Sequence, residues 1–240
     1  MASPEYEAFA ARLAAAPVPP PPADLAELRE RIEAAQAALP LADGTHAVEV
    51  DADGVFCILC ARDDGSDGDP LFIYFHGGGY RLCSATAYRS YGSRLADATR
   101  SRVLVVEYRL APENPFPAAV DDALTVYRWA LAQGNDPGTI VVGGDSAGGG
   151  LTAALLLAAR DAGLPQPAGG VLLSAWGDLR NTAESFTTNA GTDRLFSKET
   201  ADLGAGLYLG DQDRTNPLAS PALGDYSGIA PLLIHVSAAE

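Results

Sequence analysis

Apolar residues recur with two different periods in the first part of this chain. Leu25–Leu39 carries them at helical spacing with charged residues between, which predicts an amphipathic helix that ends at Pro40. Thr45–Asp51 alternates apolar and polar positions as a half-buried strand does. A second strand is expected over Val55–Ala61, and the Asp53-Gly54 turn between the two indicates an antiparallel hairpin.

Beyond residue 70, short continuous apolar runs alternate with helical patterns. Strands are predicted at Leu71–Phe75, Val103–Val106, Ile140–Val142, Val171–Leu173 and Leu232–Val236, and helices at Tyr88–Ala98, Ala118–Ala132 and Ala147–Ala162. Apolar strands that alternate with helices are typical of parallel strands buried on both faces. The predicted fold class is therefore α/β, with a mostly parallel sheet and an antiparallel hairpin at its start.

Two stretches interrupt these patterns. Pro17–Pro22 is a stiff polyproline run that no helix or central strand crosses. The segment from Gly177 to about Tyr226 is polar and is expected to be irregular.

Composition and charge narrow the function classes. The chain has 240 residues, 48% of them hydrophobic, which is enough for a sizeable core in one large domain or two small ones. Its net charge of −15 would repel nucleic acid and anionic membranes. No apolar run approaches the roughly 18–20 residues of a membrane span, and the N-terminus does not resemble a signal peptide. We expect reduced thiols and a cytoplasmic location.

The C-x-x-C pair formed by Cys57 and Cys60 is not expected to bind metal. It lies in the apolar run VFCILC, where residues three apart on a strand point to opposite faces. No second pair completes a zinc site. Both cysteines are therefore predicted to be small buried hydrophobic residues.

The pattern G-x-S-x-G at Gly144–Gly148 comes between a predicted strand and a long Ala/Leu helix. In that context it indicates a nucleophile elbow, a strained turn that exposes the Ser146 hydroxyl above the sheet. The helix N-terminus that follows stabilises developing negative charge. A phosphate-binding loop is the alternative, but the pattern G-x-x-x-x-G-K-[ST] does not occur.

Three glycines follow the strand Leu71–Phe75 in the sequence HGGGY. They leave backbone N–H groups bare and open to close approach by a ligand. Acyl transfer requires such donors, because its tetrahedral intermediate carries an oxyanion. HGGG supplies one arm of the oxyanion hole in lipases and esterases, and the N–H after the nucleophile, here Ala147, supplies the other.

Five motifs resemble the hormone-sensitive-lipase family of α/β hydrolases, in its bacterial carboxylesterase branch. They are HGGGY (His76–Tyr80), YRLAPENPFPAAVDDAL (Tyr108–Leu124), GGDSAGG (Gly143–Gly149), NPLASP (Asn216–Pro221) and PLLIHVSAAE (Pro231–Glu240). The resemblance implies a serine esterase or lipase that hydrolyses small-molecule esters without a cofactor or metal. It makes Ser146 the nucleophile and assigns the oxyanion hole to Gly78, Gly79 and Ala147. It also implies a helical cap formed by residues 1–41 and an insertion at about 178–226, on a core over 42–240.

The catalytic base and acid are less evident. His46 and His76 precede Ser146, whereas this fold orders its triad as Ser, acid, His. His235 lies inside a predicted strand and is expected to be a packed or hydrogen-bonded core residue rather than the base. The resemblance places the acid at Glu240, with Asp178 as a weaker candidate. We expect the remaining nearby acids, Asp121, Asp122 and Asp145, to tie loops together.

The sequence thus contains a nucleophile and an oxyanion hole without a credible base. Compared with the family, the last helix, strand and helix are expected to be missing, which would impair catalysis and expose the strand LLIHV at the sheet edge. A second hypothesis is a catalytically inactive ligand-binding protein on a hydrolase scaffold, as in the gibberellin receptors that resemble this family. A homodimer is left open.

Overall fold

The computed structural model describes residues 3–15, 24–190 and 197–238. A seven-stranded sheet forms its centre, in the order β1-β2-β4-β3-β5-β6-β7. The strands are β1 (Thr45–Ala52), β2 (Val55–Arg62), β3 (Leu71–Phe75), β4 (Arg102–Val106), β5 (Ile140–Asp145), β6 (Gly169–Leu173) and β7 (Leu232–His235). β1 and β2 pair antiparallel, as do β2 and β4, and all remaining pairs are parallel. The α/β fold class predicted from the sequence is confirmed.

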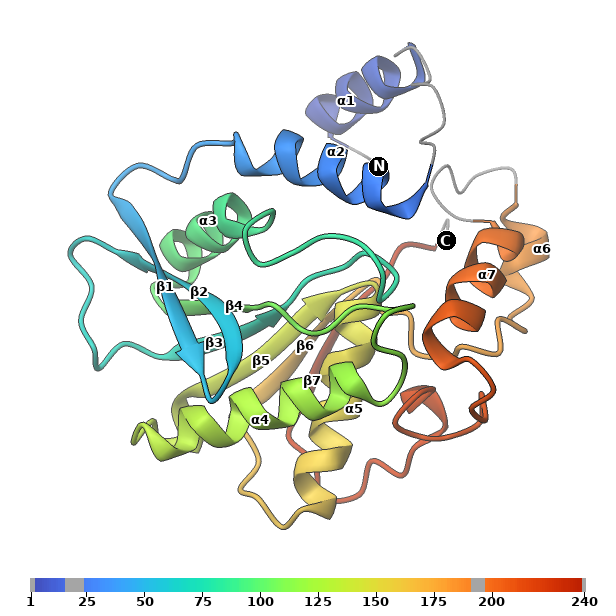
Figure 1. The fold of residues 1–240 in the computed structure, drawn as a ribbon. Helices are drawn as coiled ribbons and strands as arrows, with labels where there is room; N and C mark the ends of the chain where they lie inside the picture. The colour runs from blue at the N-terminus through green and yellow to red at the C-terminus, as the bar shows by residue number, and fades with distance from the viewer. Residues whose placement is uncertain (1–2, 16–23, 191–196, 239–240) are drawn as a thin grey trace.

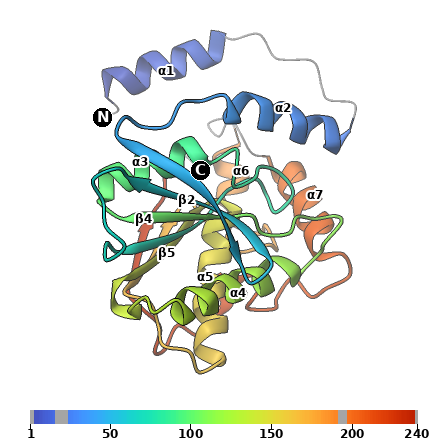
Figure 2. The same cartoon turned by 60° about the vertical axis from the view of Figure 1, so that its left-hand side comes forward.

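Helices cover both faces of the sheet (Figure 1). They are α1 (Pro4–Ala15), α2 (Leu25–Ala37), α3 (Arg89–Thr99), α4 (Ala118–Ala132), α5 (Ala147–Asp161), α6 (Ser185–Thr188) and α7 (Lys198–Leu209), with short 3₁₀ turns at Pro137–Thr139 and Pro221–Leu223. α3 packs on one face, while α4 and α5 pack on the other. Figure 2 shows α1 and α2 lying beyond α3, outside the sheet layers.

The two faces bury two separate apolar clusters. One contains the inward side chains of α4 and α5 with alternate strand residues such as Ile73 and Leu104. The other lies under α3 and contains the intervening residues, such as Phe72 and Val105. Cys57 belongs to the first cluster and Cys60 to the second, so the two cysteines lie on opposite faces of β2, as predicted. Burial raises the pKa of both thiols to about 12.

The prediction of an irregular segment over residues 177–226 was wrong in part. It contains the twelve-residue helix α7, which begins with a capping box between Ser197 and Thr200. Small residues at Ala201, Gly204 and Ala205 allow close packing, and all three are buried. The high content of polar residues and glycine concealed this helix. The Pro17–Pro22 run lies outside the described residues.

β7 forms one edge of the sheet, as predicted. Its Leu233 and Ile234 side chains are 63% and 60% exposed, which is unusual for an apolar strand. No helix within the described ranges is long and apolar enough to cross a membrane.

Candidate active site

Ser146 occupies a strained turn between β5 and α5. Its φ and ψ are 52° and −119°, a conformation that residues other than glycine rarely adopt. The segment at the end of β6 fixes the turn, because the Ser146 N–H donates to the Leu173 carbonyl and the Ser146 carbonyl accepts from the backbone N–H of Trp176. This geometry matches the nucleophile elbow expected from the sequence.

Glycines next to Ser146 permit a very close approach between chain segments. A Cβ at Gly148 would lie 1.9 Å from the Phe75 carbonyl oxygen, and one at Gly144 would lie 2.4 Å from the same atom. Any side chain there would therefore separate the first turn of α5 from the end of β3. The glycines hold the elbow directly against the strand that leads into HGGGY.

The HGGGY loop and Ser146 lie at the same end of the sheet. β3 and β5 are parallel neighbours, with Phe75 paired to Gly144, so the loop after β3 and the turn after β5 are adjacent. Gly78 and Gly79 have φ of 119° and 62°. Among the hydrogen bonds of the described residues, the N–H groups of Gly78, Gly79 and Ala147 donate none. These three amides are therefore free to bind an anion, as an oxyanion hole requires.

Asp145 ties the loop to the elbow. Its Oδ1 accepts hydrogen bonds from the Gly77 N–H at 3.0 Å and the Tyr74 hydroxyl at 2.9 Å, and its Oδ2 accepts one from the Tyr88 hydroxyl at 3.0 Å. Burial raises the pKa of Asp145, and the three hydrogen bonds oppose that shift. A Cβ on Gly77 would lie 2.2 Å from Oδ2, so only glycine fits at this position.

His76 is fully buried beneath the HGGGY loop and supports it structurally. Its Nδ1 lies 2.7 Å from the Gly77 carbonyl oxygen, and its ring stacks on Tyr108 at 4.3 Å between centroids. The Tyr108 hydroxyl donates to the His76 carbonyl at 2.7 Å. Desolvation lowers the pKa of His76 to about 4, and its Nε2 is buried without a partner.

The other two histidines lie away from Ser146. His46 lies on β1, at the far edge of the sheet, and is paired with Asp63. His235 ends β7, and its carbonyl accepts a hydrogen bond from the Ser174 N–H. Its side chain is exposed, so the expectation of a packed core histidine was wrong, because β7 is an edge strand. In the described part of the chain, no histidine nitrogen forms a hydrogen bond with Ser146.

The other acidic residues singled out in the sequence differ in their positions. Glu240 lies outside the described residues. Asp178 is held by Arg180 at 2.7 Å, and this hydrogen bond lowers its pKa. Asp122 accepts from the backbone and side chain of Arg109, which ties the loop before α4 to that helix as expected. Asp121, in contrast, is exposed at the start of α4.

Two segments outside the sheet contact the HGGGY loop. Arg29 of α2 donates to the Arg81 carbonyl at 2.8 Å and to the Ala111 carbonyl at 2.7 Å, and it pairs with Glu113. Tyr208 of α7 stacks on Tyr80, with ring centroids 3.8 Å apart. Both regions that the family resemblance assigns to a cap therefore touch residues immediately after the glycines.

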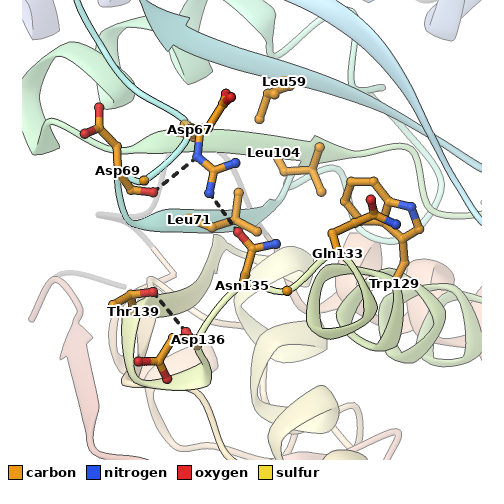
Figure 3. Close-up of a pocket in the computed structure, with 13 residues that line it drawn as sticks. Leu59, Asp67, Asp69, Leu71, Leu104, Trp129, Gln133, Asn135, Asp136 and Thr139 are labelled. Carbon is orange, nitrogen blue, oxygen red and sulfur yellow. Dashed lines mark hydrogen bonds between the residues drawn. The ribbon is translucent and has the colours of Figure 1, made fainter.

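Two cavities adjoin the sheet, one away from Ser146 and one beside Asp145. The larger, of about 600 Å³, opens at the start of β3, β4 and β5, where Arg102 bonds to Asn135 (Figure 3). It is at the opposite end of the strands from Ser146. The smaller, of about 470 Å³, lies beside Asp145 and is lined by Tyr74, Tyr88 and Tyr91. No cluster of metal-ligating side chains occurs among residues 3–15, 24–190 and 197–238.

Sequence reasoning missed several residues that hold the site. Tyr74 and Tyr88 were assigned only to a strand and a helix, although each donates a hydroxyl to Asp145. Arg29 looked like a solvated helix residue. A buried strand tyrosine is a weak signal, because its hydroxyl requires a partner. For Arg29 no local signal exists, since its partners lie more than fifty residues away.

Comparisons with known proteins point to the same fold. The alpha/beta hydrolase fold family matches residues 72–240. An acetyl-hydrolase of Streptomyces hygroscopicus is 47% identical over 182 residues, covering 75% of this chain and 59% of that protein. A putative acetyl-hydrolase of Mycobacterium tuberculosis, LipR, is 41% identical and covers 69% and 53%. The chain thus spans little more than half the length of these curated relatives.

Solved structures extend the match to the whole chain. An esterase described as a member of the bacterial hormone-sensitive lipase family has a TM-score of 0.90 and 42% identity, covering 100% of this chain and 80% of that one. EstE5, solved after soaking with p-nitrophenyl butyrate, has a TM-score of 0.91 and 38% identity with the same coverage. The chain belongs to the alpha/beta hydrolase fold family and, within it, to the bacterial hormone-sensitive lipase family.

Proposed function

We propose that this chain carries the nucleophile and oxyanion hole of a serine carboxylic ester hydrolase, acting on small-molecule esters without a cofactor. The proposal rests on the strained Ser146 turn and on the backbone amides of Gly78, Gly79 and Ala147, which donate no hydrogen bond among the described residues. The names of its relatives, acetyl-hydrolase and esterase, support the same reaction class.

In the proposed reaction, Ser146 Oγ bonds to the ester carbonyl carbon and the carbonyl oxygen becomes an oxyanion. The amides of Gly78, Gly79 and Ala147 stabilise that charge. The tetrahedral intermediate collapses, the C–O bond to the alcohol breaks, and the alcohol leaves with a proton. Water then attacks the acyl-serine and releases the carboxylic acid.

Serine depends on a general base, and the proposal assigns that role to a histidine supplied downstream of Glu240 in an extended version of the chain, with Glu240 orienting it. The alternative base within the chain is His235. Its exposed position at the end of β7, two strands from β5, makes it the first histidine to test.

The test compares hydrolysis of p-nitrophenyl acetate by the 240-residue chain, by the extended version that carries the downstream histidine, and by Ser146→Ala in each. We expect Ser146→Ala to abolish enzymatic turnover, and we expect the longer protein to be faster by several powers of ten, since loss of a triad member costs about 10⁴–10⁶-fold. Equal rates at both lengths would place the base within residues 1–240. Activity that survives Ser146→Ala would refute the assigned nucleophile.

A second candidate function is ligand binding without catalysis. One observation favours it: no described histidine bonds to Ser146. It requires that the extended version also lack turnover while still binding an ester or carboxylate. Calorimetric titration of that version with butyrate distinguishes the two, because an inactive binder retains affinity without hydrolysis.

The proposal also covers location and partners. We place the protein in the cytoplasm with small esters as its partners. The net charge of −15 argues against nucleic acid. Light scattering at several protein concentrations decides whether two copies associate, because a homodimer doubles the measured molar mass.

A further inference from the structure

Trp176 lies between the candidate nucleophile and helix α7. It follows β6 at the same end of the sheet as Ser146, and its backbone N–H donates to the Ser146 carbonyl at 2.9 Å. The six-membered ring of its indole faces Gly204 on α7, where an added Cβ would lie 3.3 Å from the ring. The Tyr80 ring lies on another side, with 6.2 Å between centroids. The side chain is partly exposed.

Arg81 completes this boundary. Its Nε lies 3.8 Å from the positions that a Cβ would take on both Gly79 and Gly204. The side chain therefore bridges the oxyanion glycines and α7, next to the indole. Trp176 and Arg81 thus both lie between the HGGGY loop and α7, and the Trp176 backbone is bonded to that of Ser146.

A chain of hydrogen bonds fixes the direction of the indole. Trp176 Nε1 donates to Asn181 Oδ1 at 2.8 Å, and Asn181 Nδ2 donates to Asp202 Oδ1 at 3.0 Å. Asn181 is 1% exposed and has a φ of 54°, so its backbone is held in an unusual conformation. An ionised carboxylate only accepts hydrogen bonds, so Asp202 turns the Asn181 amide until its oxygen faces the indole N–H.

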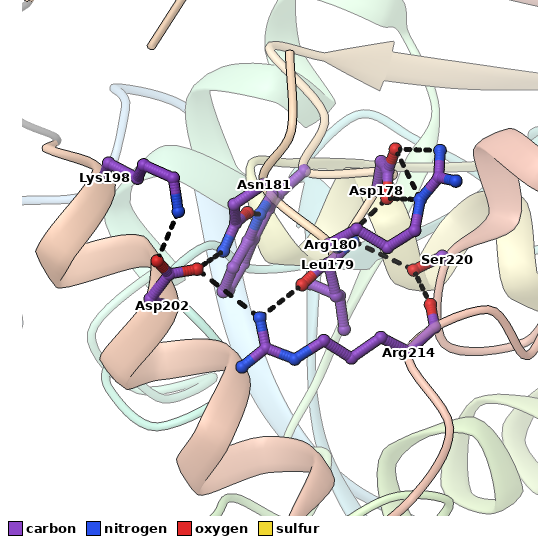
Figure 4. Close-up of polar contacts among 9 residues, drawn as sticks. Asp178, Leu179, Arg180, Asn181, Lys198, Asp202, Arg214 and Ser220 are labelled. Carbon is purple, nitrogen blue, oxygen red and sulfur yellow. Dashed lines mark hydrogen bonds and ion pairs between the residues drawn. The ribbon is translucent and has the colours of Figure 1, made fainter. Parts of the chain in front are cut away.

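Two cations keep Asp202 ionised and in place. Lys198 donates to its Oδ2 at 2.6 Å, and Arg214 approaches its Oδ1 at 3.4 Å (Figure 4). The hydrogen bonds from Lys198 and Asn181 lower the pKa of Asp202 to about 2. Arg214 also donates to the Leu179 carbonyl, which ties α7 to the segment that carries Asn181.

We propose that Trp176 determines substrate specificity by limiting the size of the ester group on the α7 side of Ser146, and that Asn181 and Asp202 are positioning residues that hold its indole. This inference rests on the proposed ester hydrolysis. It extends that function by naming the residue that selects short esters over long ones and the contacts through which α7 controls it.

The experiment measures kcat/KM for p-nitrophenyl acetate and p-nitrophenyl octanoate in the extended version of the chain. We expect Trp176→Ala, Asn181→Leu and Asp202→Ala each to raise the octanoate-to-acetate ratio by about tenfold, the lower end of what shape discrimination in an apolar pocket gives. Asp202→Asn is the conservative variant. The control is Asp213→Asn in the same segment, because Asp213 bonds to Thr215 and not to this chain of contacts.

Fluorescence provides a readout independent of turnover. The 240-residue chain has two tryptophans, so Trp129→Phe in this chain leaves Trp176 as the only tryptophan, which can be excited selectively over the tyrosines. In that background we expect Asn181→Leu and Asp202→Asn to shift the emission to longer wavelength and to increase quenching by acrylamide, with circular dichroism unchanged. Asp213→Asn should do neither.

The outcomes separate the two proposals. An unchanged ester ratio in Trp176→Ala, with turnover retained, overturns the specificity role alone. Unchanged fluorescence in both the Asn181 and Asp202 variants overturns their positioning role. Absence of Ser146-dependent hydrolysis in every protein, including the unsubstituted one, overturns the proposed function itself.

Discussion

The Gly77 N–H donates a 3.0 Å hydrogen bond to Oδ1 of Asp145, the residue directly before the candidate nucleophile. One carboxylate thus joins the start of the oxyanion loop to the nucleophile elbow. Because Gly77 lies in the loop after β3 while Asp145 ends β5, the position of that loop relative to the elbow depends on this contact and on the two tyrosine hydroxyls that share the carboxylate.

Asp145→Ala is expected to lower kcat/KM for p-nitrophenyl acetate by about a hundredfold, the order observed when one oxyanion donor is lost. The physical reason is that Gly77 loses its anchor and the following glycine amides shift. KM should change little if the amides act mainly on the transition state. Asp121→Asn, on the exposed side of α4, is the control. A kcat equal to that of the unsubstituted protein would show that Asp145 does not position the loop.

A pair of Gly→Ala substitutions tests the close approach at the elbow. At Gly148 the added Cβ would lie 1.9 Å from the Phe75 carbonyl oxygen, so we expect a loss of at least about 2 kcal/mol in the free energy of unfolding. At Gly206 in α7 nothing lies within 4 Å, so alanine should stabilise by about 1 kcal/mol through helix propensity. Urea denaturation measures both, and equal effects would contradict this packing.

The sequence predicted the sheet and its helices well because their patterns are local. Ala118–Ala132 was predicted with the observed bounds, and the buried strand Leu71–Phe75 likewise. The Ser146 turn was also predictable, because its glycines lie where a Cβ would collide with the backbone at the end of β3. In these places one physical requirement acts on consecutive residues.

Contacts between distant segments could not be predicted in this way. Asn181 and Asp202 are ordinary polar residues in the sequence, and only the fold places an indole N–H beside one of them. His235 was expected in the core because its strand is apolar, yet an edge strand exposes its side chains. Helix α7 was missed because its stability comes from a capping box and from packing by small residues.

Arg29 is expected to hold helix α2 on the oxyanion loop. Its guanidinium donates to two backbone carbonyls and forms a two-pronged pair with Glu113. Lysine keeps the charge but lacks this planar set of donors, so Arg29→Lys should free the Arg81 carbonyl. Hydrogen exchange followed by mass spectrometry should show faster exchange in peptides covering α2 and residues 78–83. Arg128→Lys, exposed on α4, is the matched control, and identical exchange in both variants would contradict the anchoring role.

His76 should make the stability of the protein depend on pH. Its pKa in the folded state is lowered to about 4, mainly by desolvation, against 6.5 as the ordinary value. Between these two values the unfolded chain binds the proton and the folded chain does not, so stability rises with pH. This contribution to the free energy of unfolding is complete above about pH 6.5 and is lost as the pH falls towards 4. A pKa difference of that size corresponds to about 3 kcal/mol.

Urea midpoints measured from pH 4 to 7.5 should therefore fall more steeply on acidification in the unsubstituted protein than in His76→Gln. Parallel curves for the unsubstituted protein and His76→Gln would mean that His76 is protonated equally in the folded and unfolded states. That result would contradict a buried neutral imidazole beneath the oxyanion loop.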